Sequence, residues 1–197
     1  AIVSGHKLEE LKIKNGRVGL RQYKEGGYFV SLSTTNLLMK YEFSESHDEF
    51  PKNPFNIGLN EMKKNYQLNL ITRFQDNDYN FVEIEFLPII DSTVYFIGNV
   101  IINESLHQVA HLELVVNNAA NHALRPIWPD DSLANVNMKI TYGFQHSDKN
   151  YRLNSINLVY GASYYNLDNQ LDSFFINSMA TLNLYNFNSL FIMPEYS

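Results

Sequence analysis

The chain has 197 residues, no cysteine and a formal net charge of -6, and these properties exclude several classes of protein. Without cysteine there is no disulfide, no thiolate metal site and no cysteine nucleophile. A chain with an acidic balance lacks the basic stripe that binds phosphate backbones, so we expect no nucleic-acid partner. The most apolar window, 86–102, is interrupted by a proline and by polar residues, and we expect no membrane insertion.

The first 43 residues have the pattern of short hairpins. A charged LEEL segment at 8–11 could form a helical turn, and Asn15-Gly16 and Gly26-Gly27 then mark turns between short alternating runs. Such brief strands need a partner surface, so we expect N-terminal β-hairpins packed on the body or on a neighbouring chain. Residues 44–57 contain two prolines and several charges, which predicts a loop or linker before a third part, 58–197.

The third part reads as antiparallel strands. Residues 58–65 (GLNEMKKN) favour one or two helical turns. The runs 66–74 and 80–87 flank a QDNDY turn, and the runs 136–142 and 153–160 flank QHSDKN, so each pair predicts a hairpin. Short strands separated by turn residues indicate an all-β protein, an antiparallel β-sandwich or barrel head.

Two further strands are predicted in the middle of the chain. In 94–102 the β-branched and aromatic residues are broken by Gly98, which indicates a bulge or a close backbone approach. In 105–116 the even positions Leu106, Ala110, Leu112, Leu114 and Val116 are apolar, which predicts a half-buried strand with His107 and His111 on its wet face. Two solvated histidines are the simpler interpretation, because a metal would need a third ligand.

The loop after this strand holds the residues best suited to binding. Pro126 and Pro129 lack the backbone N–H that strand pairing needs, so this segment cannot continue the strand and we expect an exposed loop. Trp128 offers an aromatic face for a sugar ring, and Arg125, Asp130 and His122 offer hydrogen bonds to hydroxyls or to a phosphate. The alternative is that a lone tryptophan belongs to the core.

Other constellations favour structure over chemistry. The Asp-x-Asp-x-Asn run at 76–80 resembles half of a calcium loop but lacks the glycine and glutamate that complete it, so a hairpin turn is favoured. Carboxylate pairs such as Glu83 with Glu85, or Asp130 with Asp131, suit glycosidase chemistry only at a defined separation. No hydrolase or nucleotide-binding motif accompanies them, and we expect no metal, no cofactor and no enzymatic activity.

The central stretch resembles the C-terminal heads of receptor-binding proteins at the tail tip of long-tailed phages of Gram-positive bacteria. The similarity consists of a V-x-F-x-G-x-V strand at 94–100, Arg125-Pro126 before a loop and the hairpin 136–160, about a third of the chain. The opening 8–27 also resembles the hairpin that leads into such heads. Related lactococcal heads carry a His-x-Asp and a Trp in the final hairpin, where this chain has 137–139 and Tyr160.

The resemblance implies a non-enzymatic homotrimer on the virion, outside the cell, which joins other tail or fibre proteins and attaches to a host cell-surface saccharide. Exposed aromatic residues would contact the glycan; the candidates are Trp128, Tyr142, Tyr160, Tyr164 and Tyr165. Two alternatives remain. One is a structural baseplate or capsid-type β protein without glycan binding, and the other is a polysaccharide hydrolase that uses a pair such as Asp130 and Glu113.

Overall fold

The computed structural model describes residues 2–4, 7–10, 43–45, 47–124, 126, 130–147, 150–165 and 174–183. These residues contain a helix, α2 (Leu59–Asn65), and a two-stranded sheet of β1 (Ile2–Ser4) and β2 (Lys7–Glu10). They also contain a sheet of seven strands: β3 (Tyr66–Asp76), β4 (Tyr79–Pro88), β5 (Ile97–Asn103), β6 (Gln108–Val116), β7 (Ser132–Ser147), β8 (Asn150–Tyr165) and β9 (Phe174–Asn183). Within these ranges no helix is long and apolar enough to cross a membrane.

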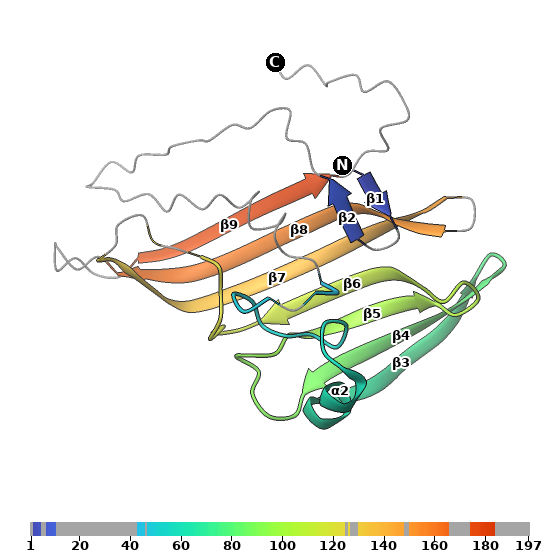
Figure 1. The fold of residues 1–197 in the computed structure, drawn as a ribbon, viewed down its shortest axis with the longest axis horizontal. Coiled ribbons are helices and arrows are strands. Elements are labelled where there is room, and N and C mark those ends of the chain that lie inside the picture. Colours follow the sequence, from blue (N-terminus) through green and yellow to red (C-terminus); the bar gives the residue numbers. More distant parts are fainter. Residues whose placement is uncertain are drawn as a thin grey trace, which may run out of the picture.

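The seven strands lie side by side in the order of the chain, from β3 to β9, and each neighbouring pair is antiparallel (Figure 1). This meander confirms the all-β class that was predicted from the alternation of residues. The strands form one open sheet and do not close into a barrel, and β3 and β9 are its edges in the described part of the chain.

The two predicted hairpins are confirmed. β3 and β4 turn at Asn77, whose φ of 51° lies in the left-handed region that asparagine tolerates. β7 and β8 are 16 residues long each and pair along most of their length, well beyond the predicted runs. The helix predicted at 58–65 is also confirmed as α2. A helical turn at 8–11 was wrong: Lys7–Glu10 form β2, because pairing with β1 supplies hydrogen bonds that an isolated turn cannot sustain.

One face of the sheet carries the hydrophobic core. Alternate residues of the central strands are buried there, among them Leu112 and Leu114 on β6, Ile140 on β7 and Leu158 on β8. The described residues of 43–57 lie in front of this face, and α2 lies at one end of β3 and β4 (Figure 1). The segment that was expected to be a loop or linker thus contributes to the core, with Phe50 only 3% exposed.

Gly98 marks a close approach between β5 and β6, as its position in the predicted strand suggested. A Cβ atom there would lie 1.9 Å from the Glu113 carbonyl oxygen and 2.7 Å from Cζ of Phe86. The bulge alternative does not apply at Gly98, since the register shift of this pair falls between Ile101 and Ile102. Glycine is required here because any side chain would meet backbone of the neighbouring strand.

The opposite face of the sheet, called the outer face below, is polar across its middle. Residues in register form a row that crosses all seven strands: Asn69, Glu85, Asn99, Glu113, Thr141, Asn157 and Thr181. Neighbouring side chains hydrogen-bond along it: Asn69 Nδ2 donates to Glu85 at 3.1 Å, Thr181 Oγ1 donates to Asn157 at 2.6 Å, and Lys139 Nζ lies 2.7 Å from a Glu113 oxygen. Cross-strand pairs of this kind stabilise a sheet and leave one face suited to water.

Candidate functional site

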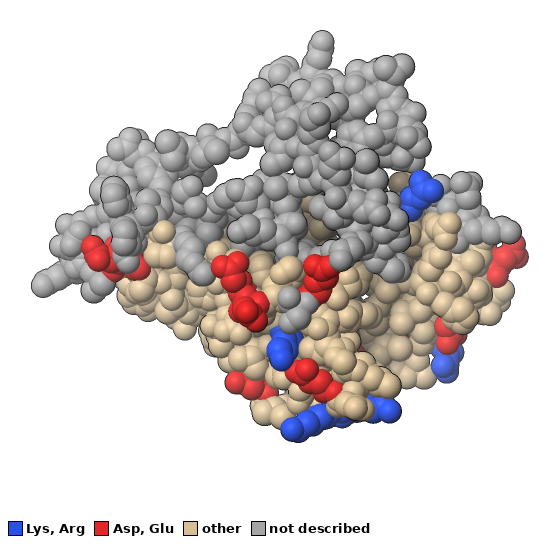
Figure 2. All heavy atoms as spheres, viewed as in Figure 1, with Lys and Arg blue, Asp and Glu red and all other residues tan. Residues whose placement is uncertain are grey.

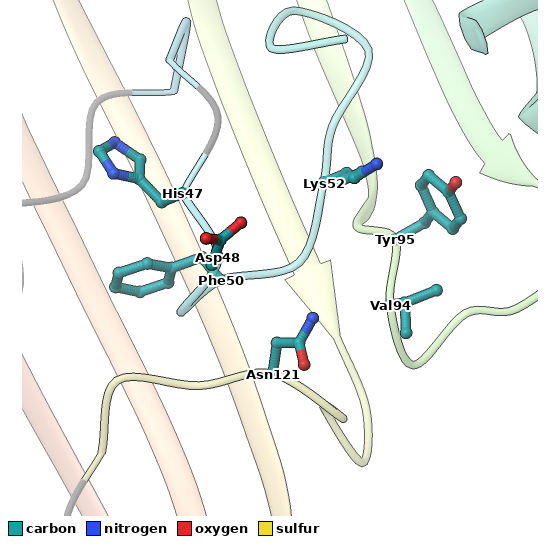
Figure 3. A pocket seen from close by; sticks show the side chains of 7 residues that line it. All are labelled: His47, Asp48, Phe50, Lys52, Val94, Tyr95 and Asn121. Atoms are coloured by element: carbon teal, nitrogen blue, oxygen red, sulfur yellow. The ribbon is translucent and has the colours of Figure 1, made fainter.

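Three chain segments far apart in sequence meet around a hollow of about 380 Å³ on the core side of the sheet. The residues that line it are His47, Asp48, Phe50, Lys52, Val94, Tyr95 and Asn121. Figure 3 shows His47, Asp48 and Phe50 on one side of the hollow and Val94 and Tyr95 on the other. The hollow is therefore a meeting point of the segment before α2, the residues just before β5 and the loop after β6.

Backbone hydrogen bonds hold the first two segments together. The Lys52 N–H donates to the Val94 carbonyl at 2.9 Å, and the Phe96 N–H donates to the Lys52 carbonyl at 2.7 Å. The buried Tyr66 hydroxyl lies 2.9 Å from the Lys52 carbonyl and 3.0 Å from that of Phe96. Because these contacts are buried or partly buried, they fix the position of Lys52 beside Tyr95.

The third segment is held in the same way. Ala119 N–H donates to the Val136 carbonyl at 2.7 Å, and Ala120 N–H donates to the Thr93 carbonyl at 2.9 Å. Asn121 follows directly and is exposed at the rim of the hollow. A site that rests on strand ends and backbone hydrogen bonds keeps its shape before a ligand arrives, which lowers the entropic cost of binding.

A polar network links Lys52 and Tyr95, which line the hollow, to α2. Lys52 Nζ forms an ion pair with Glu61 on α2 at 2.9 Å, and the same carboxylate oxygen lies 3.4 Å from the Tyr95 hydroxyl. Asn65 Nδ2 donates to that hydroxyl at 2.8 Å. The hydrogen bond to Glu61 raises the pKa of Lys52 above its ordinary value.

The lining combines an aromatic ring with groups that donate and accept hydrogen bonds. Tyr95 is half-buried and its ring packs edge-on against Tyr66 at 5.6 Å between centroids, which orients it firmly. Asp48 and Asn121 are exposed, and they add a carboxylate and an amide. Figure 2 shows acidic and basic side chains interspersed on the described part of this face. Such a lining suits a polyhydroxyl ligand better than an apolar one.

The loop residues that the sequence singled out are partly described. Arg125 and Trp128 lie outside the described residues. Asp130 is exposed in a turn before β7, and His122 is half-buried with its Nδ1 3.2 Å from the Leu124 carbonyl oxygen. The structure brings neither of them to the hollow, although Asn121, next to His122, lines it.

The tyrosines expected to be exposed are mostly in the core. Tyr142 is 1%, Tyr160 4% and Tyr164 0% exposed, so the expectation of an exposed ring is wrong for these three. They point to the same face as the buried aliphatic residues of β7 and β8, since residues two apart on a strand share a face. Tyr165, on the other face of β8, is 40% exposed.

The carboxylate pair of the hydrolase alternative is not assembled. Glu113 is opposite Thr141 in register, whereas Asp130 precedes Ser132, nine residues before Thr141 on β7. The nine residue steps from Ser132 to Thr141 alone span about 30 Å at about 3.3 Å per residue, whereas a glycosidase pair needs about 5 to 9.5 Å. Glu83 and Glu85 share the outer face as expected, and each accepts a hydrogen bond from an asparagine amide.

The two histidines that were predicted on one strand face lie in different elements. His107 lies in the turn between β5 and β6 with a φ of 53°, and His111 lies on β6. Among the described residues no group of three histidine, aspartate or glutamate side chains is placed to hold a metal.

Sequence reasoning missed most of the hollow. His47, Asp48 and Lys52 come from the segment expected to be a loop or linker, and Tyr95 was assigned to a strand. A signal was present in Phe50 and Phe55, because a solvated linker rarely carries two phenylalanines. No family model, no curated protein and no solved structure matches this chain.

Proposed function

We propose that this chain is a non-catalytic attachment module that binds a cell-surface saccharide in the hollow between His47 and Tyr95. The observation that carries the proposal is the combination of an oriented tyrosine ring with a carboxylate, an amide and an imidazole on a rigid base. Sugar rings present an apolar face and several hydroxyl groups, and this lining offers a partner to each.

The resemblance of the central strand and final hairpin to phage receptor-binding heads supports the same proposal. It suggests that the module is carried on a virion and faces the host cell wall. The confirmed all-β sheet is compatible with such a head, and an open surface site on strand ends is where a long glycan chain can enter.

Titration calorimetry with purified cell-wall polysaccharides of Gram-positive bacteria tests the proposal. The full chain should bind at least one of them, and Asp48→Ala together with Asn121→Ala should weaken binding by about tenfold or more, since each removes hydrogen bonds to the ligand. Asp78→Ala is the matched control, because it removes an exposed carboxylate at the β3–β4 turn.

The outcomes separate the alternatives. Binding that survives both substitutions in the hollow but is lost in Asp130→Ala or Trp128→Ala would move the site to the loop before β7. No binding to any polysaccharide would contradict the proposal and favour the structural β protein. Release of reducing ends from the polysaccharide would favour the hydrolase.

A further inference from the structure

The edge strand β9 has unusual properties for a strand at the edge of a sheet. In the described part of the chain its strand partner is β8, and the ten residues pair with β8 without any register shift. Its sequence, FFINSMATLN, contains no charge and no proline. Native edge strands normally carry charges, prolines or bulges that prevent pairing with another strand.

The other edge, β3, is protected by such devices. Its register with β4 shifts between Leu70 and Thr72, and it carries Arg73 and Asp76. Both edges expose large apolar side chains, on β3 those of Leu68, Leu70, Ile71 and Phe74. The contrast lies in the charges and the register shift, and within the described residues β9 is the edge strand that has neither.

The side chains of β9 point to the same conclusion. Met179 is 73% and Phe175 59% exposed on the outer face, and Val159 beside them on β8 is 44% exposed. The ring of Phe175 lies over Gly161, where a Cβ atom would come within 2.8 Å of it. Val159 and Met179 are in register, and Phe175 lies on the same face of β9 beyond Asn177. Large apolar side chains are thus exposed at this edge, whereas the middle of the outer face is polar.

β9 is also firmly attached to its own sheet. Thr181 Oγ1 donates to the Asn157 side chain at 2.6 Å, and Ser178 hydrogen-bonds to the hydroxyl of Tyr160. A strand fixed on one side presents the backbone groups of its other side in a regular row, which is a template for a further strand.

We propose that β9 pairs with β9 of a second copy of this chain, antiparallel and about a twofold axis near Met179. This inference is independent of the saccharide site. In that register Ile176 lies opposite Leu182 of the second copy and Asn177 lies opposite Thr181. Ser178 then lies opposite Ala180 and Phe175 opposite Asn183, and no charged residue falls within the paired stretch. An isologous contact requires a surface that is complementary to itself, and an uncharged strand has no like charges to oppose.

The direction of the strands also favours this arrangement. Because seven antiparallel strands alternate, β3 and β9 run the same way. A ring of copies about an axis along the strands would pair β9 with β3 in parallel, whereas the twofold contact continues the antiparallel pattern of the whole sheet.

Light scattering after size exclusion, at two concentrations a hundredfold apart, tests the inference. The full chain should have twice the mass of the 22.8 kDa chain. Met179→Lys and Met179→Glu should each reduce this mass to that of one chain, because like charges then face each other across the axis. An equimolar mixture of the two variants should restore the doubled mass, since lysine then faces glutamate.

Leu70→Lys is the matched control: Leu70 is 56% exposed on the other edge strand, and its substitution should leave the doubled mass unchanged. The inference is overturned by a single-chain mass at both concentrations, by a trimer, by a mixture that stays monomeric, or by dissociation in Leu70→Lys instead of the Met179 variants. A trimer would instead agree with the resemblance to phage heads. None of these outcomes changes the saccharide-binding test.

Discussion

Replacing Gly98 by alanine should strongly destabilise the sheet. The added methyl group would lie 1.9 Å from the carbonyl oxygen of Glu113 and 2.7 Å from Cζ of Phe86. Non-bonded carbon atoms approach to about 3.5 to 4.0 Å, so both neighbours would have to move. The Phe86 ring can shift only within a packed core, where it is 1% exposed, and the carbonyl belongs to the neighbouring strand.

The magnitude follows from these contacts. Overpacking a well-packed interior typically costs about 1 to 3 kcal/mol. Since one obstacle at Gly98 is backbone in the middle of the sheet and no change of rotamer relieves it, we expect about 3 kcal/mol or more. With a urea slope of about 2 kcal/mol per molar, the unfolding midpoint should fall by about 1.5 M.

Urea unfolding followed by circular dichroism measures the effect. Gly58→Ala is the matched control, because a Cβ atom there has no neighbour within 4 Å and the backbone at φ -68° accepts alanine. We expect its free energy of unfolding to change by less than about 1 kcal/mol. Equal midpoints for Gly98→Ala and Gly58→Ala would refute the close approach of β5 and β6.

Three further predictions concern the core. Tyr164→Phe removes the hydroxyl that donates to buried Asp131, so the free energy of unfolding should fall by about 1.5 to 3 kcal/mol; a change below about 0.5 kcal/mol in urea unfolding would contradict this role. Burial raises the pKa of Tyr160, and its hydrogen bond to Ser178 offsets part of the rise. The folded protein therefore holds this proton more tightly, and stability should fall as pH rises above about 10. The Tyr160→Phe protein lacks this pH-dependent contribution. The difference in free energy of unfolding between it and the unaltered chain should therefore shrink between pH 9 and 11, and a constant difference would argue against burial of the phenol. Phe50→Ala should cost about 3 to 5 kcal/mol if the segment before α2 is part of the core, and thermal unfolding unchanged by this substitution would show that it is not.

The strands and their contacts with neighbouring strands could be predicted largely from the sequence. Alternation in 105–116 predicted β6 with Leu112 and Leu114 inside, and Gly98 indicated the close approach that the structure confirms. These features depend on residues one or two positions apart, which the period of a strand relates directly. β7 begins earlier than predicted because its alternation is interrupted at Asn135, which has a φ of 52° beside a register shift, and the strand continues on both sides of this interruption.

The residues of the hollow could not be predicted in the same way, because they come together through long-range contacts that the periodicity of a strand does not describe. Lys52 and Tyr95 are 43 positions apart in sequence and meet through an isolated parallel bridge. The charges of 44–57 suggested solvent, whereas Phe50 in the same segment is buried. Tyr142 and Tyr160 were taken for exposed rings, although each lies two positions from a buried aliphatic residue and so shares its face. Because tyrosine is amphipathic, its residue type does not decide whether the ring is buried. The strand face on which it lies predicts its burial better.

The proposal of a saccharide site in the hollow is tested most directly by nuclear magnetic resonance of the isotope-labelled chain. Backbone amide shifts should be followed during titration with the polysaccharide that binds best in calorimetry. We expect saturable shifts that cluster at Asp48, Lys52, Tyr95 and Asn121, with little change along β9. Shifts that avoid these four residues and gather elsewhere on the sheet, or no shifts at a saturating concentration, would contradict it.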